Sequence, residues 1–317
     1  MEYPRRGHGA ATTHLARPPR YGTVFEGRAP GCAPCAVKKI SKVSCRNVDD
    51  LRTLADEIEA LRALSGSGAT PALLAAIASP RFLYIAMEFG GETLSRVLEE
   101  DRYVGLGLKA PVVVHGVATA LATLHAKGFV HLDLKSDNVL VTRRDGRVVD
   151  VRLCDLGFAQ RLEENGPPSP VCVSRTGDFD GIQSYAKFEI ACGSAGFWAP
   201  EMIIGSNIDG RAADIWSFAC LALETIIGTD QFDRSWLPSY ENYSVGIECD
   251  YHFFVIGLAL PLKTARDMAR AAGPLPKTRA LVSACLSVDA AARPSAAACR
   301  DWLAAGDDAV AGIMLPY

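Results

Sequence analysis

Three polar residues at a fixed spacing, Asp133, Lys135 and Asn138, interrupt the otherwise apolar stretch VHLDLKSDNVLV. A further carboxylate, Asp155, follows after two segments with the pattern of strands. A carboxylate, an ammonium and an amide at the end of a buried strand could together bind and orient a charged ligand. On its own, however, the spacing D-x-K-x-x-N is also typical of a solvated loop, so the surrounding elements must decide between the two interpretations.

The first third of the chain predicts a small, mainly β unit. The stretches YGTVFEGR and CAVKKI alternate with the period of a strand, and the Gly- and Pro-rich GRAPGCAP between them predicts a hairpin connection. After Gly66 to Pro71, a loop is expected to lead into a buried strand, RFLYIAMEF. Between these parts, apolar residues recur at three- and four-residue steps, which predicts an amphipathic helix from Val48. The residues that mark its stripe are Leu51, Leu54, Ile58, Leu61 and Leu64.

The rest of the chain predicts a mainly helical unit. One helix ends at Lys127–Gly128, a basic last turn followed by a glycine stop. Its apolar face is marked by Val114, Val117, Leu121 and Leu124. Two strands follow, NVLV and VVDVRLCD, joined by a turn at Asp145–Gly146. The stretch ADIWSFACLALETIIG is apolar nearly all round, which predicts a buried central helix, and further helices are expected to about Ala305. Residues 160–191 are polar, and a loop this long is either functional or disordered.

The composition is that of an ordinary globular protein, with 49% hydrophobic and 22% charged residues among 317. This length predicts one large two-lobed domain or two small domains. The formal net charge of -3 provides no basic surface for a phosphate backbone, so no nucleic-acid partner is expected. The longest apolar window, Phe253 to Leu262, is too short to span a bilayer, and residues 1–20 lack the apolar core of a secretory signal. We therefore expect no membrane association and a cytoplasmic or nuclear location.

The ten cysteines are scattered, and those in apolar runs predict buried free thiols rather than a disulfide framework. These are Cys154, Cys220 and Cys285. Cys32 and Cys35 form one CxxC pair, but zinc would need a second pair or histidines at ligand spacing, and none follows. Cys154 directly precedes Asp155, and an inert thiol is preferred there over a reactive one, because reactivity needs a lowered pKa and access.

Three motifs in a fixed order, HLDLKSDN, CDLG and GSAGFWAPE, resemble the catalytic loop, the metal-binding motif and the substrate-platform segment of the protein kinase superfamily. The resemblance extends over roughly Leu15 to Leu303. It implies an α+β fold of two lobes, a small antiparallel β lobe with one helix and a larger α-helical lobe. The expected boundaries are an N-terminal extension (1–14), a kinase domain (15–305) with its small lobe (15–87) and large lobe (88–305), and a C-terminal tail (306–317).

The resemblance implies transfer of the γ-phosphoryl group of ATP, with Mg2+, to Ser or Thr hydroxyls of a protein substrate by a monomeric enzyme. Asp133 would act as the catalytic base toward the substrate hydroxyl, and Lys135 would contact the γ-phosphate. Asn138 and Asp155 would bind magnesium. Lys135 and Ser194 resemble the Ser/Thr branch of the superfamily, in which both side chains brace the base.

In the small lobe, the resemblance implies that Lys38 meets the ATP phosphates. Ala36, two residues earlier on the same face of the strand, would cover the adenine. The lysine needs a carboxylate anchor on the helix, and Glu57 and Glu59 are both candidates. Glu57 is in step with the apolar stripe and Glu59 is not, so Glu57 is the expected partner.

The remaining nucleotide contacts also follow from the resemblance. Val24 and Leu140 would enclose the adenine ring from its two faces. Met87 stands at the gatekeeper position of the hinge strand. The backbones of Glu88 and Gly90 would be available to the edge of the base. These apolar positions would also suit an ordinary core.

The chain departs from the family pattern in two places. Of the three glycines expected over the phosphates only Gly22 remains, because Arg17 and Pro19 occupy the other two positions. Since side chains and a fixed φ limit how closely the backbone can approach the phosphates, a pseudokinase or nucleotide-binding scaffold is an alternative to an active kinase. Leu132 replaces the usual Arg before Asp133, so phosphorylation of the activation segment is not expected to switch the enzyme on. A kinase acting on small molecules is a further alternative, against which GSAGFWAPE argues.

Three further residues resemble structural positions of the family. Glu201 would pair with Arg293, far along the chain, and Asp214 would brace the backbone of the catalytic loop. Because breaking a buried pair by removing one partner is costly, these residues are expected to affect folding more than chemistry.

Overall fold

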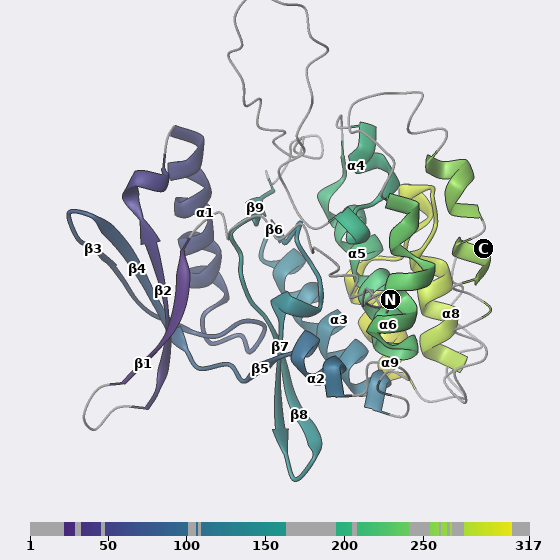
Figure 1. Ribbon diagram of the computed structural model, residues 1–317, viewed down its shortest axis with the longest axis horizontal. Coiled ribbons are helices and arrows are strands. Elements are labelled where there is room, and N and C mark those ends of the chain that lie inside the picture. The colour runs from purple at the N-terminus through teal and green to yellow at the C-terminus, as the bar shows by residue number, and fades with distance from the viewer. Residues whose placement is uncertain are drawn as a thin grey trace, which may run out of the picture.

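The computed structural model describes residues 22–28, 33–45, 48–100, 106, 109–162, 195–204, 208–240, 254–259, 261–264, 267 and 276–305. Within these ranges a small antiparallel sheet with one long helix lies beside a larger, mainly helical lobe, as Figure 1 shows. The α+β architecture of two lobes predicted from the sequence is confirmed. The expectations for 1–14, Arg17, Pro19, 163–191, Ser194 and 306–317 lie outside the described residues.

The small lobe consists of β1 (Thr23–Gly27), β2 (Cys35–Ser41), η1 (Lys42–Ser44), α1 (Val48–Leu64), β3 (Leu73–Ala78) and β4 (Phe82–Glu88). Its four strands pair antiparallel in the order β1-β2-β4-β3. The register sets Val24 opposite Lys38, and Lys38 opposite Ile85, so the middle of β2 lies at the centre of the sheet. Helix α1 lies beside this sheet on the side of the large lobe, where it contacts β9 (Gln160–Arg161) (Figure 1).

Two expectations for the small lobe were wrong. The residues of β3 were expected to form a loop, but LLAAIA pairs with β4 along its length. Its alanines have low β-propensity and most of its side chains are exposed, so pairing with β4 rather than local sequence makes it a strand. Leu51 is 57% exposed, because the buried stripe of α1 begins one turn later at Leu54 and continues through Leu61 and Leu64.

The large lobe begins with β5 (Glu92–Thr93), α2 (Leu94–Glu100), α3 (Ala110–Ala126), β6 (Phe129–Val130), η3 (Ser136–Asn138), β7 (Val139–Arg144), β8 (Arg147–Leu153) and β9. It continues with η4 (Ala195–Phe197), α4 (Pro200–Ile204), α5 (Gly210–Ile227), α6 (Thr229–Ser235), η5 (Leu237–Tyr240), α8 (Pro276–Cys285), η6 (Ala290–Ala292) and α9 (Ala296–Ala304). Residues 254–259 and 261–264 are also helical.

The short strands of the large lobe form two small antiparallel sheets, β5-β7-β8 and β6-β9. The predicted turn at Asp145–Gly146 joins β7 to β8, and both of its residues are left-handed, with φ of 50° and 72°. Such a turn matches the twist of a two-residue hairpin. The hairpin brings the residue that follows β8 back beside the loop that precedes β7.

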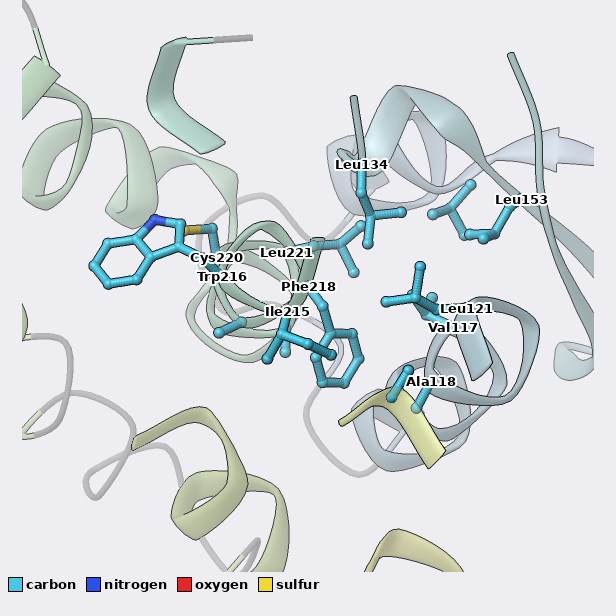
Figure 2. Packing of buried hydrophobic residues seen from close by; sticks show 14 of the residues in the cluster. Val117, Ala118, Leu121, Leu134, Leu153, Ile215, Trp216, Phe218, Cys220 and Leu221 are labelled. Atoms are coloured by element: carbon cyan, nitrogen blue, oxygen red, sulfur yellow. The ribbon is translucent and has the colours of Figure 1, made fainter. Parts of the chain in front are cut away.

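Helix α5 forms the centre of the large lobe and is buried along nearly its whole length, as predicted. Figure 2 shows Leu221 of α5 pointing toward Val117 and Leu121 of α3, with Leu134 and Leu153 closing the same cluster. Leu134 belongs to the stretch VHLDLKSDNVLV, and Leu153 lies two residues before Asp155. The core therefore holds in place the two chain segments that carry the candidate catalytic residues.

The free thiols of Cys220 and Cys285 are buried, as predicted, whereas Cys154 is only half-buried. Cys32 lies outside the described residues, and the half-buried thiol of Cys35 donates to the Gly27 carbonyl at 3.6 Å. Among the helices of the described ranges, none has the length and apolar character needed to cross a membrane.

Candidate active site

Lys38 lies at the centre of a group of three charges that come from distant parts of the chain. Its Nζ is 2.6 Å from Oε1 of Glu57 on α1 and 2.8 Å from Oδ1 of Asp155, which follows β8. Lys38 is 6% exposed and Glu57 is 1% exposed, so this ion pair is shielded from water. Glu59, the other candidate partner, instead forms an ion pair with Arg161. The choice of Glu57 from helical periodicity agrees with this geometry.

The electrostatics of this triad keep the lysine charged. Burial alone would lower the pKa of Lys38, but the carboxylates of Glu57 and Asp155 outweigh it and the pKa is raised. Burial raises the pKa of Glu57, and the charge of Lys38 counteracts only part of that effect. Burial also acts to raise the pKa of Asp155, but Lys38 dominates and the pKa is lowered. Lys38 is therefore a permanent cation beside an ionised Asp155.

The catalytic-loop residues form a second polar cluster. The Asn138 amide donates to Oδ2 of Asp133 at 2.9 Å and to its main-chain oxygen at 2.7 Å. The ammonium of Lys135 is 3.4 Å from the same Oδ2. Burial raises the pKa of Asp133, although Lys135 and other neighbours act in the opposite direction. Because its nitrogen faces Asp133, the oxygen of the Asn138 amide is directed away, where it can act as a ligand.

Asp214 of α5 holds the backbone between the two clusters. Its carboxylate is fully buried and accepts hydrogen bonds from the N–H groups of His131 and Leu132, each at 2.8 Å, and from the ring of His125 at 2.9 Å. Leu132 has a φ of 62° and Asp155 a φ of 53°. Left-handed conformations of such residues cost of order 1 kcal/mol or more and persist only where their surroundings fix them. The predicted bracing role of Asp214 agrees with this arrangement.

Val24 and Ala36, the small-lobe residues expected to contact the nucleotide, lie near Lys38 on β1 and β2. Val24 is opposite Lys38 in the sheet and is 60% exposed, so an apolar surface is available beside the ammonium. Ala36 lies two residues before Lys38 on the same face of β2. Gly22 has a φ of 89°, and a Cβ there would lie 2.3 Å from the carbonyl oxygen of Lys39. Glycine is therefore required at this one remaining position of the motif.

The connection between the lobes brings Gly90 and Leu140 together, since a Cβ on Gly90 would lie 2.5 Å from the Leu140 side chain. The expectation for the Glu88 backbone is narrowed to its carbonyl group. Its N–H donates to the Ala72 carbonyl at 2.9 Å, so this group is not available to a bound base. Its carboxylate pairs with Arg152 of β8 at 2.6 Å, a link between the lobes that the sequence pattern did not indicate.

The charged residues fit a magnesium ion that arrives with phosphate rather than an independent metal site. No group of three or more His, Cys, Asp or Glu side chains that could bind a metal occurs in the described part of the chain. Asp155 has a half-exposed carboxylate, and Asn138 offers an amide oxygen. Magnesium is commonly bound by one or two such oxygens, with phosphates and water completing its shell.

Arg293 and Glu201 form a bidentate ion pair with distances of 2.7 and 2.8 Å. The Arg293 side chain is fully buried and also donates to the carbonyl oxygens of Ala212 and Ser287. The pair joins the start of α4 to α5 and to the segment before α9. This agrees with the structural role expected for the two residues.

Sequence reasoning missed one buried acid next to the catalytic loop. Glu224 of α5 is 4% exposed and accepts hydrogen bonds from the hydroxyls of Thr229, at 3.1 Å, and Ser136. Burial raises its pKa to about 7, and Asp233 and Asp137 add to the effect. The signal was present in the sequence, because Glu224 is a second acid besides Asp214 in the apolar run ADIWSFACLALETIIG.

The family model that matches the chain is described as protein kinase domain and covers residues 20–302. Ribosomal protein S6 kinase alpha-2 of Mus musculus is 30% identical over 155 residues, 48% of this chain and 18% of that protein. Maternal embryonic leucine zipper kinase of Xenopus laevis is 28% identical over 200 residues, 62% of this chain and 27% of that protein. Serine/threonine-protein kinase Pkn1 of Myxococcus xanthus is 32% identical over 166 residues, 51% of this chain and 20% of that protein. The chain thus spans between 18% and 27% of the length of these curated relatives.

Proposed function

The chain belongs to the protein kinase family, and we propose that it transfers the γ-phosphoryl group of ATP to serine or threonine hydroxyls of a protein substrate. The observation that carries the proposal is the convergence of Lys38 with Glu57 and Asp155, at 2.6 and 2.8 Å, beside the loop that holds Asp133 and Asn138. Phosphoryl transfer depends mainly on positioning and on neutralising charge, and these residues supply both.

Asp133 acts as the base. As the oxygen of the substrate hydroxyl forms its bond to the γ-phosphorus, the proton of the hydroxyl passes to the Asp133 carboxylate and ADP leaves with the electrons of the broken P–O bond. The Asn138 amide fixes the plane of that carboxylate. The raised pKa of Asp133 brings it closer to the working pH, which favours a general base. Lys135, 3.4 Å from the same oxygen, neutralises charge on the transferring group.

Lys38 orients the phosphates of ATP, and Glu57 fixes the ammonium in the direction of the cleft. Asp155 and Asn138 would hold magnesium, which supplies charge neutralisation on the phosphates when it is bound with ATP. Asp155 would then exchange part of its contact with Lys38 for the metal. Its half-exposed carboxylate leaves it accessible for that exchange.

The adenine and ribose bind between the small lobe and the start of the large one. Val24, Ala36 and Leu140 provide the apolar faces of this pocket, Met87 its inner wall, and the backbone of Gly90 faces the edge of the base. Gly22 directly precedes β1, and its left-handed backbone leaves no room for a side chain beside the carbonyl of Lys39. Glu88 contributes to this pocket through its main-chain carbonyl, because its N–H bonds to Ala72 and its side chain pairs with Arg152.

Leu132 gives the enzyme a regulatory character of its own. The side chain is 3% exposed and apolar, so the position that carries Arg in most of the family offers no cation to a phosphorylated residue. We infer a monomeric kinase whose activation segment need not be phosphorylated. Its domain extends over 15–305, with the division between lobes near Met87.

The test is incorporation of label from γ-labelled Mg-ATP into a mixed protein acceptor, followed by phosphoamino-acid analysis, for the wild type and for Asp133→Asn. We expect phosphoserine and phosphothreonine from the wild type and a loss of label by a factor of about a hundred or more in the variant. Equal label from both proteins would contradict the role of Asp133. No label from either protein, together with nucleotide binding, would favour the scaffold alternative.

A further inference from the structure

The position of α1 decides whether Lys38 can act, because Glu57 on that helix fixes the lysine. Glu57 is buried and meets Lys38 at 2.6 Å, and a shift of α1 away from the sheet would break this contact. A helix packed on one side against a small sheet needs a second anchor on the side that faces the large lobe. That anchor should connect to the part of the large lobe that carries the catalytic loop.

Strand β9 makes this connection. Its residues Gln160 and Arg161 pair with Val130 and Phe129 of β6, and the next residue, Leu162, donates to the Gly128 carbonyl at 2.7 Å. Strand β6 leads directly into the catalytic loop. The backbone of Arg161 is therefore fixed to the base of the loop that presents Asp133.

The side chain of Arg161 reaches in the opposite direction, to α1. Its Nη1 forms a hydrogen-bonded ion pair with Oε1 of Glu59, two residues after Glu57. Because the two glutamates lie on different faces of the helix, Glu57 can point into the site while Glu59 points to β9. One chain of contacts thus runs from the catalytic loop through Arg161 and Glu59 to Glu57 and Lys38.

We propose that Arg161 is a positioning residue for phosphoryl transfer, which holds α1 against the large lobe through Glu59 and so keeps Lys38 and Glu57 in register with Asp133. This rests on the proposed kinase function. Leu132, buried beside the same loop, cannot perform this task, since its side chain carries no charge. A further ion pair, Glu88 with Arg152, joins β4 to β8 and involves no residue of α1.

The strength of the Arg161–Glu59 pair sets the size of the expected effect. The two side chains are 62% and 47% exposed, so their attraction is weak and is screened by salt. Exposed pairs of this kind change an equilibrium by at most about fivefold. The pair therefore biases α1 between an engaged and a displaced position and contributes little to the stability of the whole domain.

The experiment measures kcat, KM for ATP and Tm for Arg161→Ala, Glu59→Ala and the charge-swapped double variant Glu59→Arg/Arg161→Glu. Arg300→Ala is the matched control, because Arg300 forms another solvent-exposed pair with Asp301 on α9, away from the site. We expect each single variant to lower kcat at low salt by up to about threefold, the double variant to recover most of that loss, and Tm to stay within about 1 °C. The deficit should shrink at about 0.5 M salt, whereas Arg300→Ala should match the wild type in every measurement.

Unchanged kcat in both single variants would overturn the proposal, as would a double variant no better than the singles. A parallel fall in kcat and Tm would also overturn it, because that result indicates general destabilisation. The same assay also compares the wild type with Asp133→Asn. If the proposed kinase function were wrong, these two proteins would incorporate equal label, whereas an error in the role of Arg161 would appear only among the Arg161 and Glu59 variants.

Discussion

Glu224 makes the stability of the domain depend on pH in a direction opposite to that of most acids. Its carboxyl is buried on α5 and accepts hydrogen bonds from Ser136 and Thr229, and within the described part of the chain its Oε2 has no partner. Burial raises the pKa from an ordinary 4.5 to about 7 in the folded protein. The folded state therefore holds this proton over a pH range in which the unfolded state has released it.

The sign and size of the effect follow from linkage. Between about pH 4.5 and pH 7 the folded protein binds one more proton at Glu224 than the unfolded chain, so this residue's contribution falls as pH rises. The stabilisation that Glu224 provides is fully present below about pH 4.5 and decreases between pH 4.5 and pH 7. Above pH 7 the contribution of Glu224 no longer changes with pH. At 1.36 kcal/mol per pH unit the whole change is about 3 kcal/mol, of which about 2.5 kcal/mol lies between pH 5 and pH 8.

The substitution Glu224→Gln removes the titration and keeps a polar group of the same size. We expect the free energy of unfolding of Glu224→Gln, measured by urea denaturation, to gain about 2.5 kcal/mol relative to the wild type between pH 5 and pH 8. Glu99→Gln, at an exposed position on α2, is the control and should run parallel to the wild type. If the Glu224→Gln and wild-type curves were parallel as well, Glu224 would be equally charged in both states and the reasoning from burial would be wrong.

Three other outcomes test the site and its supports. Glu57→Gln should lower kcat about 10- to 100-fold, because a charge-assisted hydrogen bond to Lys38 is worth about 1.5 to 3 kcal/mol. Steady-state kinetics measure kcat, and a circular dichroism spectrum should show that the fold is unchanged. Arg293→Ala should lower the free energy of unfolding by about 3 to 5 kcal/mol, because it leaves Glu201 without its partner. A wild-type Tm in thermal denaturation would contradict this expectation. Phosphatase treatment, verified by intact mass, should leave kcat unchanged because Leu132 offers no cation to a phosphate, and a loss of activity would refute that role.

Several of the recovered residues are related locally or periodically, whereas Glu201, Arg293 and Asp214 were expected only from the resemblance to the family. Asp133, Lys135 and Asn138 lie within a single loop, so their spacing already fixes their proximity. Glu57 was separated from Glu59 by its step on the helix, and the ion pair of 2.6 Å with Lys38 agrees with that argument. The buried character of α5 followed from a run of apolar residues longer than any strand.

The features that escaped sequence reasoning depend on contacts between distant segments. The residues of β3 lack a strand pattern, and only pairing with β4 makes them extended. Arg152 and Arg161 look like ordinary surface arginines until the hairpin and β9 bring them to Glu88 and Glu59. The Glu88 backbone was expected to face the nucleotide, and nothing in the sequence reveals that its N–H bonds to Ala72 instead.

The two left-handed residues show how the fold prepares the site. Leu132 and Asp155 adopt conformations that L-residues disfavour, and neither residue type predicts them. Each is held by a charged group that lies elsewhere in the sequence: the Asp214 carboxylate accepts the N–H of Leu132, and the Lys38 ammonium binds the side chain of Asp155. Since this strain persists only while those partners are present, the catalytic loop and Asp155 keep their conformations only when both the core of the large lobe and the sheet of the small lobe are formed. Catalytic geometry in this domain is thus a property of the assembled lobes, and variants of Asp214 should lose it together with the fold.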